Sequence, residues 1–122
     1  MKHLHAVSAL LELGAGAALL ALPSATAELL IGSALAGPAP LTVARVGGGG
    51  LLAVGLACWL ARNDTQSRAG RGLVLALLVY NVVVVAVLAY ASIGLGLHGV
   101  LLWPAVVLHL GMAAWCIAAA VR

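Results

Sequence analysis

The sequence contains very few charged residues. Lysine and arginine together number six, aspartate and glutamate number three, and charged residues make up only 7% of the chain, whereas 65% is hydrophobic. A soluble domain carries about 25% charged residues. So few charges could not cover a water-facing surface, which excludes an ordinary soluble domain. The length of 122 residues allows one domain and no separate soluble module.

The sequence also lacks the patterns of a nucleic-acid-binding protein and of a cysteine-based metal or redox site. Its net charge of +3 is scattered and forms no basic patch with interleaved aromatic residues, so no nucleic-acid partner is expected. The two cysteines, Cys58 and Cys116, are in neither a metal-type nor a C-x-x-C spacing. Both lie in apolar runs, and we interpret them as small apolar side chains in helix contacts.

Long apolar stretches, in contrast, are abundant. A helix needs about 20 apolar residues to span a bilayer. The sequence has four such stretches, each bounded by polar or helix-breaking residues. We therefore predict a single all-α transmembrane domain over residues 1–122, an integral membrane four-helix bundle. The predicted spans are residues 4–22, 41–61, 72–92 and 100–121.

Basic residues are unevenly distributed about these spans. Cytoplasmic loops of membrane proteins carry an excess of lysine and arginine. With four spans, one side holds five basic residues, while the opposite loops hold Glu28 and His98 and no lysine or arginine. Only Arg45 departs from the pattern, because it lies inside the second span. Both termini are therefore expected to be cytoplasmic. The five basic residues are Lys2, Arg62, Arg68, Arg71 and Arg122.

The segment that follows the first span is too short and too interrupted to cross a membrane. We predict a short helix or turn on the outer interface over residues 24–36, with Ser24 as the N-cap. Pro38 and Pro40 then disfavour helix before the second span begins.

An alternative for the N-terminal region is a cleaved signal peptide. Ala25 and Ala27 form an A-x-A pattern after an apolar run, as at a signal-peptide cleavage site. Glu12 would interrupt the apolar core of such a signal, and cleavage would leave only three spans. We therefore expect the first span to be retained.

Glycine is concentrated at the start of the second span. Helices associate in lipid through small residues that let their backbones approach. The run 47–50 is all glycine, and Gly55 follows it. Gly14 and Gly16 in the first span offer a matching surface, so we expect these two helices to pack closely. The third span has few small residues and is expected to face lipid or another protein.

Each predicted span carries one strongly polar residue. A charge at the bilayer centre costs about 2.5–3.5 kcal/mol, so such residues find partners or stay neutral. At about 1.5 Å rise per residue, Glu12 and Asn81 lie at similar depths, and His109 lies within reach. Arg45 is farther away and could extend inward or outward, towards Glu28. The candidate ligand-binding or polar cluster is Glu12, Arg45, Asn81 and His109.

Three interpretations of this cluster stay open, and one of them is contact with another subunit. The four side chains could form interhelical hydrogen bonds, worth about 0.6–2 kcal/mol each, that fix the register of the helices. Alternatively, they could form a ligand or proton-relay site, because ionisable groups inside a membrane indicate function by default.

Sequence motifs of common catalytic sites are absent. No Walker loop, G-x-G-x-x-G with an acidic partner, H-E-x-x-H or G-x-S-x-G occurs. His109 is the only histidine expected at mid-membrane depth, so neither a haem with two histidine ligands nor a zinc site within one chain is expected. We predict no catalytic residues, no metal and no cofactor, and an enzyme is not the favoured interpretation.

Residues 44–62, ARVGGGGLLAVGLACWLAR, resemble the Arg-x-x-Gly-rich second helix of the DoxX-like group of small four-helix bacterial membrane proteins. The layout is similar too, with a first span, a proline, a short outer amphipathic segment and further spans. The resemblance implies a multi-pass protein of the bacterial cytoplasmic (inner) membrane and draws attention to Arg45. A few members of that group are described as membrane subunits of quinone-linked oxidoreductases, which adds quinone to the candidate ligands.

Two function classes follow from these patterns. The favoured one is a non-catalytic accessory or self-associating subunit of a larger membrane complex or homo-oligomer, with the lipid bilayer as its surroundings. The alternative is a binder or transporter of a small lipophilic molecule, a quinone or a lipid, that uses the mid-membrane polar cluster. A filled interior at Glu12 would favour the first class, and a cleft open to lipid would favour the second.

Overall fold

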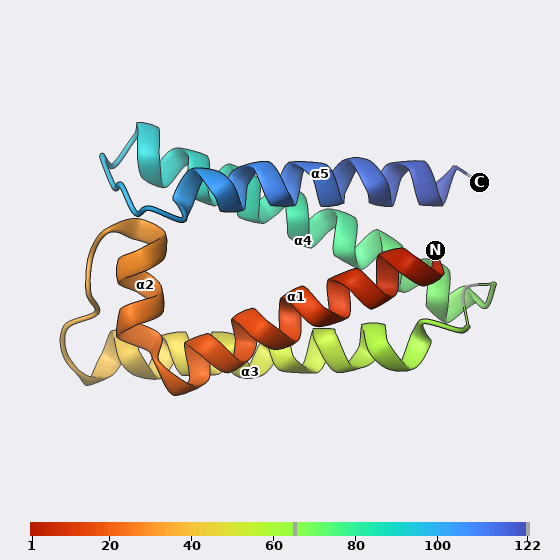
Figure 1. The fold of residues 1–122 in the computed structure, drawn as a ribbon, viewed down its shortest axis with the longest axis horizontal. Coiled ribbons are helices and arrows are strands. Elements are labelled where there is room, and N and C mark those ends of the chain that lie inside the picture. Colours follow the sequence, from red (N-terminus) through yellow and green to blue (C-terminus); the bar gives the residue numbers. More distant parts are fainter. Residues whose placement is uncertain (65, 122) are drawn as a thin grey trace.

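The computed structural model describes residues 1–64 and 66–121, and its regular structure is entirely helical (Figure 1). Four of the helices are long and apolar enough to cross a membrane. They overlap the four predicted spans, which confirms the all-α prediction and supports a multi-pass membrane protein. Arg122, which entered the orientation argument, lies outside the described residues. The helices are α1 (Lys2–Ala21), α2 (Pro23–Ile31), α3 (Pro38–Ala61), α4 (Arg68–Ile93) and α5 (Leu102–Ala120).

Two of the long helices begin several residues earlier than predicted. α3 begins at Pro38, with prolines in its first turn. The expectation that both prolines precede this helix was wrong, because a first-turn residue needs no N–H donor and the proline ring presets a helical φ. α4 begins at Arg68 because the hydroxyl of Ser67 accepts a hydrogen bond from the Gly70 amide at 3.0 Å and caps the helix.

The predicted short helix is present as α2, but its ends differ from the prediction. Leu22 is its N-cap residue and Pro23 stands in its first turn, so Ser24 is not the cap. The Ser24 hydroxyl instead accepts a hydrogen bond from the Leu35 amide at 3.1 Å. The helix ends at Ile31 because Gly32 adopts φ +72°, a left-handed conformation that glycine favours.

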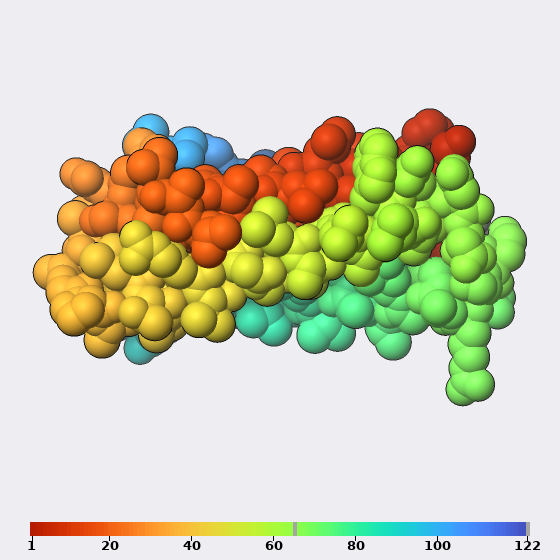
Figure 2. All heavy atoms as spheres, turned by 90° about the horizontal axis from the view of Figure 1, so that it is seen from below, coloured from red at the N-terminus to blue at the C-terminus, as the bar shows by residue number. Residues whose placement is uncertain are grey.

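The long helices associate as two antiparallel pairs. α1 lies along α3, and α4 lies along α5, with much sparser contact between the pairs. Figure 2 shows α1, in red and orange, in continuous contact with α3, in yellow and lime. The start of α1, the end of α5 and the α3–α4 connection lie together at one end of the molecule, which we call the terminal end (Figure 1). We call the opposite end the α2 end.

Glycine gives α1 and α3 their close approach. A Cβ atom on Gly16 would lie 2.7 Å from the carbonyl oxygen of Gly48, and one on Gly55 would lie 2.9 Å from the amide nitrogen of Leu13. The expected glycine contact between the first two spans is therefore present. It uses only some of the predicted glycines, because a Cβ atom would meet nothing within 4 Å at Gly14, Gly47, Gly49 and Gly50.

Two apolar clusters fill opposite ends of the molecule. At the terminal end, Leu4 of α1 packs with Cys58 of α3, Val74 of α4 and Cys116 of α5, which joins the two pairs. The second cluster is smaller and centres on Leu102 and its neighbours from α4 and α5.

At the α2 end, α2 lies between the two pairs (Figure 1). It follows α1 after the single residue Leu22. Near its other end, the Leu29 carbonyl accepts a hydrogen bond from the Leu101 amide at 2.9 Å. Any side chain at Gly99 would collide with the backbone of Leu30, so this junction is tight. α2 therefore connects the first pair to the second.

Candidate functional site

A cleft of about 860 Å³ lies between the two helix pairs. All five helices contribute to its lining. The lining is almost wholly apolar, because every residue other than Glu12, Thr26, Tyr80 and His109 is alanine, valine, leucine, isoleucine or proline. Several lining residues, among them Ala15, are exposed, so the cleft is open to the surroundings.

Glu12 lies in the wall of this cleft, halfway along α1, and only 4% of its surface is exposed. Tyr80, from the middle of α4, lines the same cleft, and its hydroxyl lies near the Glu12 carboxyl group without making a regular hydrogen bond to it. The two residues belong to different helix pairs. They therefore lie on opposite sides of the space that separates the pairs.

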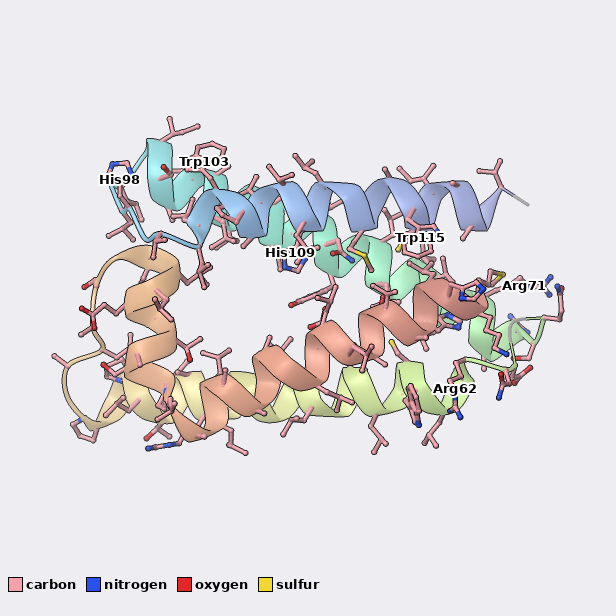
Figure 3. All side chains as sticks on the ribbon, viewed as in Figure 1. Arg62, Arg71, His98, Trp103, His109 and Trp115 are labelled. Atoms are coloured by element: carbon pink, nitrogen blue, oxygen red, sulfur yellow. The ribbon has the colours of Figure 1, made fainter. Side chains whose placement is uncertain are left out.

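His109 lines the same cleft from α5, and it is bound to Asn81 of α4. Figure 3 shows the His109 side chain on the face of α5 that is turned towards α1. Its Nδ1 atom lies 2.7 Å from the Asn81 Oδ1 atom, and the Asn81 Nδ2 atom donates to the Leu77 carbonyl at 2.7 Å. The ring of Tyr80 meets the ring of His109 edge to face, with centroids 5.7 Å apart.

The structure therefore brings together three of the four predicted cluster residues: Glu12, Asn81 and His109. Arg45 does not join them. Its side chain is exposed on α3, and its Nε atom donates to the Leu20 carbonyl at 3.3 Å. An arginine at this position gains more from a backbone carbonyl and the polar edge of a membrane than from the apolar interior.

Sequence reasoning missed Tyr80, whose ring contacts His109 and which lines the cleft together with Glu12. The signal was available, because Tyr80 directly precedes Asn81 and must lie at nearly the same depth. It was overlooked because tyrosine is only weakly polar. The side-chain direction that turns Tyr80 across the cleft depends on the arrangement of the two pairs.

A second polar group lies nearer the terminal end. His5 and Ser8 are fully buried on α1, and neither the ring nitrogens of His5 nor the hydroxyl of Ser8 has a hydrogen-bond partner. The carbonyl of Ala61 lies near the His5 ring but outside hydrogen-bond geometry. Among the residues that the structure describes, no group of three or more histidine, cysteine, aspartate or glutamate side chains is placed to hold a metal ion.

No family model, curated protein or solved structure matches the chain. The function is therefore argued from the site itself. The site is an apolar cleft whose polar groups gather halfway along the membrane-spanning helices. Such a site can hold an apolar body and orient it through one polar end.

Proposed function

We propose that this protein binds a small lipophilic molecule in the cleft between its two helix pairs. The single observation that supports the proposal is the cleft at Glu12. Polar residues that only hold the helices in register through hydrogen bonds need no empty volume beside them. The volume of the cleft falls within the usual range of ligand pockets, about 300–1,000 Å³. Its apolar walls suit a molecule that arrives from the membrane.

The quinone and lipid classes suggested by the sequence, together with the DoxX-like resemblance, are part of this proposal. An accessory or self-associating subunit is the competing proposal. It rests on the short connections between helices and on the apolar outer face of α4, where Leu75, Val79 and Val82 are exposed. A surface of this kind suits lipid as well as it suits a partner protein, so the cleft gives ligand binding the stronger support.

We also propose that the terminal end faces the cytoplasm of a bacterial inner membrane. Arg62 and Arg71 lie at this end (Figure 3), and Lys2 and Arg68 begin α1 and α4 there. An excess of basic residues on one side is the strongest signal of orientation. A protease site added before Met1 should therefore stay uncut in intact spheroplasts and be cut after their lysis.

Native mass spectrometry after gentle extraction from the native membrane tests the binding proposal. The intact chain should retain a small molecule. Ala15→Phe, which places a large side chain in the cleft, should lose it. Ala17→Phe is the matched control, because Ala17 is exposed on the same helix and does not line the cleft. Equal retention by both variants would contradict the proposal, and a stoichiometric second polypeptide without a small molecule would favour the accessory subunit.

A further inference from the structure

The polar end of the cleft is rich in hydrogen-bond acceptors. The Asn81 amide nitrogen donates to the Leu77 carbonyl, so the Asn81 oxygen is the atom that accepts from His109 Nδ1. Nδ1 therefore carries a proton, and Nε2 is an acceptor when the ring is neutral. The Glu12 carboxylate adds two more acceptor oxygens, while Tyr80 supplies one hydroxyl donor.

No lysine or arginine among the described residues balances Glu12. Among residues 1–64 and 66–121, no lysine or arginine lines the cleft, and Arg45 is turned away from it. A carboxylate at mid-membrane depth is costly unless it gains a partner of opposite charge or a proton. The cleft thus lacks a positive charge beside its one acidic group, and it has an apolar volume next to that group.

We infer that the ligand is a lipophilic amine, bound as its ammonium form, with Glu12 as its counter-ion. The inference rests on the proposed binding function and names the ligand class for the same cleft. An ammonium group donates hydrogen bonds and accepts none, which matches the acceptors of Glu12 and His109. The ring of Tyr80 adds a surface that favours a cation, and the apolar body of the ligand lies among the leucines and valines of the walls.

Binding of this kind exchanges one cation for one proton. When Glu12 is protonated, arrival of the ammonium ion releases that proton, so the site stays neutral, first as a carboxyl group and then as an ion pair. Protons and amine therefore compete for the same carboxylate, and acid weakens binding. The titratable groups that face Glu12 are Tyr80 of α4, His109 of α5 and Cys58 of α3.

Three probes with the same apolar body test the inference: naphthylethylamine, naphthylethanol and naphthylacetate. Their binding is measured by equilibrium dialysis against the full chain in lipid nanodiscs, with empty nanodiscs subtracted. At about pH 8, where an alkylamine like that of lysine is protonated, the amine should bind about tenfold or more tightly than the alcohol, which corresponds to at least about 1.4 kcal/mol. Lowering the pH to about 5 should weaken amine binding and leave alcohol binding unchanged.

Glu12→Gln keeps the size of the side chain and removes its charge. This variant should bind the amine and the alcohol equally and show no pH dependence. If the pH dependence persists in Glu12→Gln, His109 is the titrating group and the inference is wrong. The comparison of the three probes on the unaltered chain decides the question even if the variant does not fold.

The possible results separate this inference from the proposed function. Equal binding of amine and alcohol by the unaltered chain, or a preference for naphthylacetate, overturns the amine inference and leaves the binding function standing. If none of the three probes binds beyond the empty nanodiscs, both the inference and the proposed function fail.

Discussion

The two helix pairs share an antiparallel arrangement but are held together by different contacts. In the α1–α3 pair, the backbones approach where Gly16 meets Gly48, and no side chain could be added at either position without a collision. In the α4–α5 pair, Gly72 and Gly111 have nothing within 4 Å of an added Cβ atom, so they support no close approach. There the contact consists of larger side chains and the Asn81–His109 hydrogen bond.

The difference between the pairs shows two ways in which apolar helices associate without a hydrophobic driving force. Lipid tails are as apolar as leucine, so helix contact must come from close packing or from interhelical hydrogen bonds. The α1–α3 pair uses close packing. The α4–α5 pair uses a hydrogen bond, and that bond also places His109 in the cleft wall.

The largest expected effect is on the glycine contact. Gly48→Ala should destabilise the protein by about 1–3 kcal/mol, because the added Cβ atom would lie 2.8 Å from the Gly16 carbonyl oxygen. Gly49→Ala is the matched control, since its Cβ atom meets nothing within 4 Å, and it should be neutral or stabilising by up to about 1 kcal/mol. Equilibrium unfolding in mixed micelles measures both, and equal effects would show that close approach does not hold this pair together.

A smaller effect is expected for the hydrogen bond of the second pair. A double-mutant cycle with Asn81→Leu and His109→Leu should give a coupling energy of about 0.6–2 kcal/mol. The cycle separates this bond from the second bond of Asn81, to the Leu77 carbonyl. Additive effects of the two substitutions, measured by the same unfolding method, would mean that side-chain packing alone holds α4 against α5.

The smallest effect is expected at Ser8. Its hydroxyl is buried without a hydrogen-bond partner, so Ser8→Ala removes an unsatisfied group and should be neutral or slightly stabilising. Ser67→Ala is the contrast, because it removes the cap of α4 and should cost about 0.5–2 kcal/mol. A loss at Ser8 as large as the loss at Ser67 would show that the Ser8 hydroxyl makes a stabilising hydrogen bond in the folded protein.

Apolar run length was enough to predict the spans and the short helix between the first two. The first residues of α3 and α4 were harder to predict, because they depend on local chemistry at Pro38 and Ser67 rather than on hydropathy. Glycine composition correctly indicated that the first two spans pack together. Which glycines make contact depends on the crossing of the helices, and sequence spacing does not fix that crossing.

The candidate site was predicted in part, for a similar reason. Depth along each helix placed Glu12, Asn81 and His109 together; in the structure Glu12 and His109 line one cleft, and Asn81 is hydrogen-bonded to His109. Depth does not specify the direction in which a side chain points about its helix. Arg45 lies on the outer surface, and Tyr80 turns towards Glu12, because the helices form two separate pairs rather than one evenly packed bundle.

The position of α2 has a consequence for the persistence of the cleft. A helix of nine residues is about 13 Å long, and it stands between the pairs as a rigid spacer with one end on α1 and the other hydrogen-bonded at Leu101. The length of a helix therefore separates the two pairs at this end, in addition to the bulk of the lining side chains. Residues of the lining can change in size while the helix that separates the two pairs stays the same.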